Sequence, residues 1–241
     1  MVDTGCAYTV RELVTSLKGY QVDRIVNTHS HEDHIAGNAA LQNIYGADVL
    51  AHPMALPVLA DPKKRQPLRL YQQLMWGYPT PSLGKAIGDF VETDHHRFEV
   101  IHTPGHSPDH VCLYESDQGW LFSGDLFVGG QDRALRADYN IWLIITSLKK
   151  VAALDIRILF PGSGTVRQNP RDAIIGKIEY LKELGERILA LYRQGLSYGQ
   201  IRRKLLGAEM PIAYFTLGHF NGKNLVRSYI EDRPHRNESV P

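Results

Sequence analysis

The stretch His29-Ser30-His31-Glu32-Asp33-His34 holds three imidazoles and two carboxylates in six consecutive positions. Imidazole nitrogen and carboxylate oxygen are ligands that zinc accepts in proteins. His29 and His31 stand two residues apart at the end of a predicted strand, so both side chains can point to one side and converge on a single cation. Asp33 and His34 lie in the turn that follows and can reach a second cation, which two-metal sites hold about 3.5 to 4 Å from the first. The stretch therefore predicts a metal centre, against the simpler reading of a polar loop that contains histidines.

The residues on either side of this stretch indicate a β-α-β unit. Residues 22–28 form a short apolar run that ends in the polar stretch, as in a buried strand that opens onto a functional loop. Residues 36–45 have a helical pattern that Gly46 ends, and residues 48–52 read as the next strand.

Two more candidate ligands follow predicted strands further along the chain. His106 stands in Thr103-Pro104-Gly105-His106 and Asp125 stands in Ser123-Gly124-Asp125, in turns made tight by proline and glycine. Further strands are predicted over residues 98–103, 110–115, 120–123 and 156–160, with a helix over 141–154. Short strands that alternate with helices favour the α/β class.

These motifs, in this order and at these spacings, resemble the metallo-β-lactamase superfamily, whose signature is H-x-H-x-D-H, then T-P-G-H, then G-D and a final P-G-H-G. The resemblance extends from about Asp3 to Gly164 and implies the αββα sandwich of that family. It assigns His29, His31 and His106 to a first metal, Asp33 and His34 to a second, and Asp125 to both as a bridge. It also implies that Asp33 is catalytic and orients a metal-activated hydroxide. The implied cofactor is Zn2+ at one or two ions per chain, with Fe or Mn as alternatives.

The sequence departs from the family pattern at Ser163, which stands in Pro161-Gly162-Ser163-Gly164 where the last histidine ligand is expected. A neutral hydroxyl is a poor zinc ligand, so the second site is predicted to be weaker, to hold a water at that corner or to be empty. The strands that precede residues 2–5 in the family are missing, through a trimmed chain, a misplaced start codon or a real truncation. One sheet is therefore expected to be short. His110 is implied as a residue that supports the ligands from behind, or equally as a structural histidine.

Two groups of residues are candidates for substrate binding. Aromatic side chains between residues 61 and 88 could form a lid over the metals, although local packing explains such aromatics equally well. Two arginines after the Asp125 turn could hold an anionic group, although surface arginines are usually only solvated. The candidates are Tyr71, Trp76, Tyr78, Arg133 and Arg136.

The composition is that of an ordinary globular protein. The chain has 241 residues, of which 43% are apolar and 22% charged, enough for one large domain or one domain with a small appendage. No apolar run approaches the ~18 to 20 residues of a membrane span, and the first residues show no signal-peptide pattern. Cys6 and Cys112 match neither a disulfide framework nor a zinc spacing. These features predict a cytoplasmic chain with no membrane partner.

A composition shift near residues 170 to 195 predicts a catalytic domain over 1–169 and a helical C-terminal region over 170–241. Apolar residues recur at helical spacing over 174–192, and Ser197 with Gln200 forms a capping-box pattern before a second helix. A last helix is expected over 224–232. The stretch from 193 to 236 carries a net charge of +5, while the rest of the chain carries −4.

The motifs and the resemblance predict a metal-dependent hydrolase that acts on a thioester, ester or lactone, in the manner of the glyoxalase II-like branch. One alternative is an endoribonuclease, because some relatives that cut RNA carry a winged-helix-like tail and the basic tail has the charge that nucleic acid requires. Another is a sulfur dioxygenase with a single iron on His29, His106 and Asp125, and a fourth is a degenerate, non-catalytic relative. A small molecule is the expected partner, nucleic acid is the weaker alternative, and a homodimer is left open.

Overall fold

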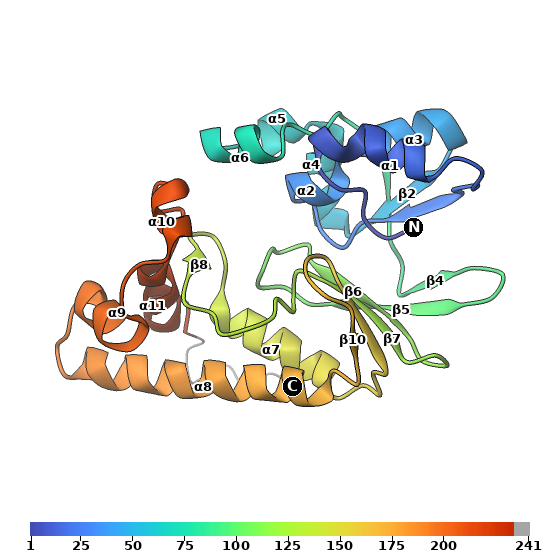
Figure 1. Cartoon of the computed structure of the whole chain (residues 1–241). Coiled ribbons are helices and arrows are strands. Elements are labelled where there is room, and N and C mark those ends of the chain that lie inside the picture. The colour runs from blue at the N-terminus through green and yellow to red at the C-terminus, as the bar shows by residue number, and fades with distance from the viewer. Residues whose placement is uncertain (234–241) are drawn as a thin grey trace.

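The computed structural model describes residues 1–233, and Arg236 of the basic tail lies outside this range. Two β-sheets lie face to face, with helices on both outer faces (Figure 1). This arrangement confirms the αββα sandwich that the sequence predicted. Within residues 1–233, no helix is both long and apolar enough to cross a membrane.

The first sheet has three parallel strands in the order β1-β2-β3. Its small size agrees with the short sheet expected from the sequence. At the β1 edge, Val2 forms an isolated parallel bridge with Val26. The elements of this half are β1 (Arg24–Val26), β2 (Asp48–Ala51), β3 (Gly84–Ala86), and the helices α1 (Val10–Ser16), α2 (Glu32–Ile35), α3 (Asn38–Tyr45), α4 (Leu56–Ala60), α5 (Pro62–Arg65) and α6 (Leu70–Met75), with the short 3-10 helices η1 (Ala7–Thr9) and η2 (Pro53–Ala55).

The predicted β-α-β unit is confirmed, because α2 and α3 connect the parallel strands β1 and β2, with Ile25 paired to Val49. Gly46 ends α3 in the left-handed conformation, with φ of 68°, where glycine is tolerated best. Ile25, Leu41 and Val49 are buried in the apolar layer between this sheet and the helices that cover it.

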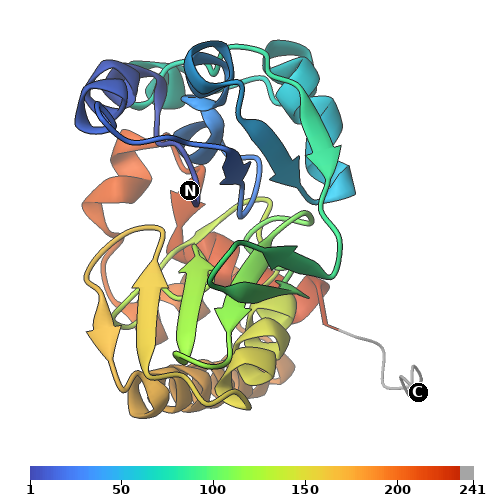
Figure 2. The same cartoon turned by 90° about the vertical axis from the view of Figure 1, so that its right-hand side faces the viewer.

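The second sheet has six strands in the order β10-β9-β7-β6-β5-β4. Its pairs are antiparallel except β7 with β9, which are parallel and connected through α7. These elements are β4 (Phe90–Glu92), β5 (Arg97–His102), β6 (Val111–Glu115), β7 (Trp120–Gly124), β9 (Ile158–Pro161), β10 (Arg167–Gln168) and α7 (Ile141–Ala152). Figure 2 shows helices below the second sheet, on the face that points away from the first sheet.

The core lies in layers that follow the sandwich. Val26 of the first sheet packs with Val91 and Leu113 of the second, so apolar side chains fill the space between the sheets. On the other face, Leu121 and Leu159 pack in the cluster that also contains residues of the outer helices. The central strand β6 serves both layers, because Leu113 belongs to the layer between the sheets while Cys112 and Tyr114 belong to the outer one.

The C-terminal elements are α8 (Arg171–Arg193), α9 (Tyr198–Leu206), α10 (Pro211–Phe215), β11 (Phe220–Asn221) and α11 (Gly222–Glu231), and β11 pairs with β8 (Leu135–Arg136). The predicted capping box at Ser197 and Gln200 is present. Leu148 of α7 and Tyr229 of α11 belong to one apolar cluster, so the core continues across residue 170. The β8–β11 pair places the segment after Asp125 beside the C-terminal helices.

Candidate metal centre

Three turns from the two sheets meet at one edge of the sandwich. His29 and His31 follow β1, His106 lies in the turn between β5 and β6, and Asp125 follows β7. The three imidazoles are only 1%, 7% and 8% exposed, respectively. Residues that lie up to 96 positions apart in the sequence are thereby brought into one buried cluster.

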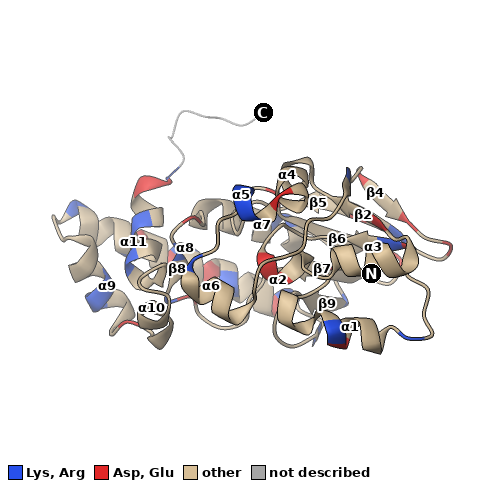
Figure 3. Ribbon diagram, turned by 90° about the horizontal axis from the view of Figure 1, so that it is seen from above, with Lys and Arg blue, Asp and Glu red and all other residues tan. Residues whose placement is uncertain are grey.

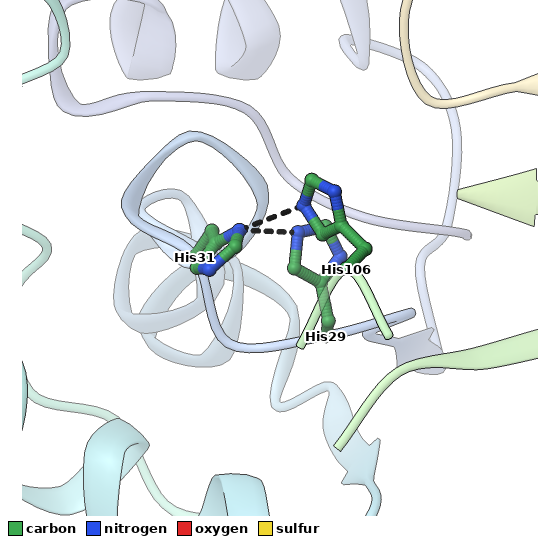
Figure 4. A group of neighbouring side chains, drawn as sticks. All are labelled: His29, His31 and His106. Carbon is green, nitrogen blue, oxygen red and sulfur yellow. Dashed lines mark hydrogen bonds between the residues drawn. The ribbon is translucent and has the colours of Figure 1, made fainter. Parts of the chain in front are cut away.

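The first group consists of His29, His31 and His106, whose rings face one another (Figure 4). The Nδ1 atom of His31 lies 2.9 Å from Nε2 of His29 and 2.9 Å from Nε2 of His106. Burial lowers the pKa of all three imidazoles well below the usual value, so they are neutral at pH 7. Nδ1 of His31 carries at most one proton, so it can donate in only one of these two contacts. In the other contact two nitrogen lone pairs face each other, as they do around a cation.

The second group consists of His29, His34 and Asp125, whose ligand atoms lie within 4.8 Å of one another. Nε2 of His34 is 3.6 Å from Oδ2 of Asp125 and 4.0 Å from Oδ2 of Asp33. The same Asp125 oxygen is 3.5 Å from Nε2 of His106. Asp125 therefore lies between the two groups, in the position of a carboxylate that can serve both.

Charge within the second group is unbalanced without a cation. Burial opposes ionisation of Asp125, but the hydrogen bond with His34 and the neighbouring histidines lower its pKa well below the usual range. Burial would lower the pKa of His34, but the carboxylates of Asp3 and Asp125 raise it well above the usual value. Oδ1 of Asp125 is buried with no hydrogen-bond partner in the part of the chain that the structure describes. A cation would satisfy this oxygen and replace the proton on Nε2 of His34.

Asp3 orients one histidine directly and a second through Thr28. Nδ1 of His34 donates to Oδ2 of Asp3 at 2.8 Å, which leaves Nε2 directed toward Asp125. The Thr28 hydroxyl donates to the same Asp3 oxygen at 2.8 Å, so it accepts from Nδ1 of His29 at 3.0 Å. Nε2 of His29 is then free to bind a cation. Carboxylates that fix the ring orientation of metal ligands in this way are common in metalloproteins.

Asp3 and Thr28 were not singled out from the sequence. The contact between Asp3 and His34 spans 31 positions, and no spacing rule links them. The only local signal is the Asp3-Thr4-Gly5 turn, in which Asp3 has a φ of 53° and Gly5 a φ of 71°. Aspartate is among the few residues other than glycine that visit this left-handed region.

His110 lies behind the Asp125 turn and is fully buried. Its Nε2 accepts from the backbone N–H of Asp125 at 3.1 Å, and its Nδ1 donates to the Thr103 hydroxyl at 2.8 Å. Burial lowers the pKa of His110 to about 4, which keeps the ring neutral as this pattern requires. The structure therefore places His110 where it holds the backbone of a candidate ligand.

Two glycines let the turns approach the cluster. Gly105 has a φ of 134°, and a Cβ there would lie 2.4 Å from the backbone nitrogen of Ile144, so the His106 turn packs directly on α7. At Gly162 a Cβ would lie 2.7 Å from Oδ1 of Asp125.

Ser163 follows Gly162 and is exposed, and among the described residues no hydrogen bond connects its hydroxyl with the candidate ligands.

A cavity of about 330 Å³ opens beside the metal centre. His31, Asp33, His106 and Asp125 line one end of it. This volume lies within the usual range of about 300 to 1,000 Å³ for small-molecule sites. Burial raises the pKa of Asp33 to about 6.

The structure brings three of the five predicted substrate-binding residues to this cavity, namely Tyr71, Trp76 and Arg136. It does not bring the other two. The Tyr78 hydroxyl accepts from the backbone N–H of Leu68 at 2.9 Å and so supports the α5–α6 connection. The Arg133 guanidinium donates to the carbonyl of Leu206 at 2.6 Å, at the end of α9. The sequence could not show this, because both arginines lie in one short segment.

Tyr139 is a cavity residue that the sequence analysis did not identify. Its hydroxyl lies 3.2 Å from Nε2 of His106, and its ring stacks near His31 at a centroid distance of 6.0 Å. Burial raises the pKa of Tyr139 well above the usual value, so the phenol keeps its proton and can donate a hydrogen bond. No motif marks this position.

The fold and this cluster agree with the comparison to known families. The model of the metallo-beta-lactamase superfamily matches residues 1–163, so the chain belongs to this superfamily. Hydroxyacylglutathione hydrolase of Polaromonas sp. strain JS666 is 30% identical over 159 residues, which are 64% of this chain and 53% of that protein. The chain spans about half the length of such curated relatives.

Solved structures support the same fold. A metallo-beta-lactamase family protein from Thermus thermophilus has a TM-score of 0.65 at 20% identity, over 96% of this chain and 83% of that one. The crystal structure of TTHA1623 in a di-iron-bound form has a TM-score of 0.57 at 26% identity, over 71% of this chain and 85% of that one. The first of these extends the similarity of fold into the C-terminal region.

The donors present fit the metal that the family implies. The cluster offers four imidazoles, those of His29, His31, His34 and His106, and the carboxylate of Asp125. Imidazole nitrogen suits zinc or iron, and zinc also accepts carboxylate oxygen. The unpartnered Oδ1 atom of Asp125 is the observation that fits a bound cation most directly.

Proposed function

We propose that this chain is a metal-dependent hydrolase that cleaves a small thioester, ester or lactone. The observation that carries this proposal is the convergence of His29, His31, His106 and Asp125 in one buried cluster at the end of a cavity. The similarity to a hydroxyacylglutathione hydrolase supports the choice of a thioester or related acyl substrate. A cytoplasmic location and a division near residue 170 remain part of the proposal.

We assign His29, His31 and His106 to a first metal and Asp33 and His34 to a second, with Asp125 shared between them. When bound, a divalent cation lowers the pKa of water from 15.7 to about 7 and polarises the carbonyl under attack. Zinc is the metal we expect, at one or two ions per chain. Iron is the alternative, since a structural neighbour is described in a di-iron-bound form.

The residues of the chain have distinct tasks in this proposal. Asp33 lines the cavity, where it can accept a proton from the attacking water and return it to the leaving group. The Tyr139 hydroxyl, which lies beside His106, donates a hydrogen bond to the oxygen on which negative charge develops. This hydrogen bond strengthens in the transition state as the charge grows. Asp3, Thr28 and His110 hold the candidate ligands in place.

The nuclease alternative receives less support from the C-terminal residues. Lys and Arg residues occur on both α9 and α11 (Figure 3). However, Nε of Arg202 pairs with Oε1 of Glu209 at 3.3 Å, and Nε of Arg227 lies 3.9 Å from Oε2 of Glu231. Part of the positive charge is therefore neutralised within the tail.

The test combines metal analysis with hydrolysis of S-acetyl and S-lactoyl thioesters. Protein purified without added metal should contain zinc, and its turnover should be lost on treatment with a chelator and restored by zinc. His31→Ala should lose both metal and turnover. His95→Ala is the matched control, because His95 is exposed on the β4–β5 turn. Full turnover by chelator-treated protein would contradict the proposal, and one iron per chain without hydrolysis would favour the dioxygenase.

A further inference from the structure

The cavity extends from the metal centre to a wall to which C-terminal residues contribute. Leu135 of β8 contributes to this wall together with Ile212 and Phe215 of α10 and Phe220 of β11. Met75 and Trp76 line the same cavity from the end of α6. These six residues are named the apolar wall. The metal ligands come from residues 29–125, whereas three of these six lie beyond residue 210.

The charged and polar groups near the apolar wall already have partners. Nζ of Lys177 pairs with Oδ2 of Asp132 at 2.8 Å and also donates to the carbonyls of Val128 and Gly130. The Thr216 hydroxyl donates to the carbonyl of Ile212 at 2.7 Å. A ligand at this end of the cavity therefore gains little from its own charge and much from its apolar surface.

The two helices that contribute to the apolar wall also carry exposed apolar side chains. On α6, Leu70 and Leu74 are 68% and 69% exposed, and on α10 Phe215 is 53% exposed. The two helices are neighbours, since the rings of Tyr71 and Phe215 are 6.1 Å apart and the Tyr71 hydroxyl is 2.7 Å from Nδ1 of His219. Such a patch beside a cavity indicates a binding surface for an apolar group.

We propose that the apolar wall is the subsite for a medium-length apolar acyl chain of the substrate. This inference rests on the proposed function and specifies its substrate class. The metal ligands require a polar, reactive carbonyl at one end of the cavity, and the wall requires an apolar group at the other. An acyl thioester or ester with an apolar chain meets both requirements in one molecule.

The first test measures hydrolysis along a series of N-acetylcysteamine thioesters from acetyl to decanoyl. Each added methylene should raise kcat/KM about three- to fourfold until the chain fills the subsite, because a buried methylene contributes about 0.8 kcal/mol. Phe215→Ser and Ile212→Ser should flatten this dependence, so that kcat/KM no longer rises with chain length. Tyr214→Ser is the matched control, since Tyr214 lies on the same helix, is 73% exposed and does not line the cavity.

The second test measures binding without catalysis. Isothermal calorimetry on metal-free protein should show binding of octan-1-ol and octanoate but not of ethanol or acetate. Phe215→Ser should weaken octan-1-ol binding about tenfold, while Tyr214→Ser should not change it. Circular dichroism of each variant identifies a folding defect, and Ile212→Ser replaces Phe215→Ser if that variant unfolds.

The outcomes separate this inference from the proposed function. Hydrolysis with a rate independent of chain length would overturn the inference and leave the hydrolase proposal intact. Binding of octan-1-ol with no hydrolysis of any thioester, ester or lactone would support the subsite and overturn the hydrolase. A dimer that is lost in Phe215→Ser, with no binding of octan-1-ol to either form, would show that a second copy covers the wall and would overturn the inference.

Discussion

At the scale of single residues, the orientation of the metal ligands depends on one carboxylate that binds no metal in the proposed centre. Asp3 fixes His34 directly and His29 through Thr28, so one side chain sets a ring in each ligand group. Its position explains why a histidine-rich stretch forms a defined cluster. A histidine that is free to rotate would lose side-chain entropy on binding a cation.

We predict that Asp3→Asn lowers metal affinity by about 10- to 100-fold, the usual effect of removing such a supporting carboxylate. Asparagine also tolerates the left-handed conformation at this position, so the backbone should be retained. Competition with a chromophoric chelator measures the affinity. Asp48→Asn is the control, because Asp48 is an exposed acid that pairs with Lys85 on the surface. Equal affinities in both variants would contradict the assigned role.

Tyr139 supports a second prediction at this scale. Tyr139→Phe removes a hydroxyl 3.2 Å from Nε2 of His106 and keeps the ring that packs beside His31. We expect kcat to fall about 100-fold, as when a donor to the developing oxyanion is removed, with unchanged metal content. Tyr20→Phe, at a site that is 70% exposed, should have no effect. A loss of metal together with turnover would instead indicate a structural role.

At the scale of elements, α6 connects the metal-binding stretch with the C-terminal region. Nε2 of Gln72 donates to Oε1 of buried Glu32 at 2.7 Å, and Nε2 of Gln66 donates to the other oxygen at 3.1 Å. On the other side of α6, Tyr71 contacts His219. The sequence predicted an aromatic lid over residues 61–88 but not the helices α5 and α6. Helices this short produce no periodic pattern.

The contact between Tyr71 and His219 predicts a dependence of stability on pH. Burial lowers the pKa of His219 from 6.5 to about 4, so the folded state resists a proton that the unfolded chain accepts. The contribution of neutral His219 to the free energy of unfolding is fully present above pH 6.5 and is lost as the pH falls from 6.5 to about 4. Urea midpoints measured over this range should fall less steeply for His219→Gln than for the original chain. Parallel curves would show that His219 does not titrate as described.

At the scale of the whole molecule, the sequence predicted the layers and most of the candidate ligands, because each ligand follows a strand in a short motif. The structure brings together His29, His31, His34, His106 and Asp125 as those motifs implied, with Asp33 at the edge of the cluster. What the motifs could not show depends on tertiary contacts. The pairing of β8 with β11 joins residues 135 and 221, and it decides that Arg136 faces the cavity while Arg133 contacts α9.

We predict that metal removal destabilises the whole chain, because the cation binds the folded cluster and not the separated ligands of the unfolded chain. At 100 times its Kd, a metal ion adds about 2.7 kcal/mol, which for a chain of this size raises Tm by about 5 to 10 °C. Thermal unfolding with chelator, and then with zinc in excess, measures the difference. His31→Ala should unfold at the same temperature with and without zinc.

The pairing of β8 with β11 also separates catalysis from substrate selectivity along the chain. Residues before 126 carry the candidate metal ligands, Tyr139 lies between the two segments, and residues after 210 help to shape what enters the cavity. Grafting a different stretch onto residues 211–221 should therefore alter which compounds are accepted without disturbing the chemistry. In this architecture, selectivity can diversify through its final helices while the catalytic machinery stays constant.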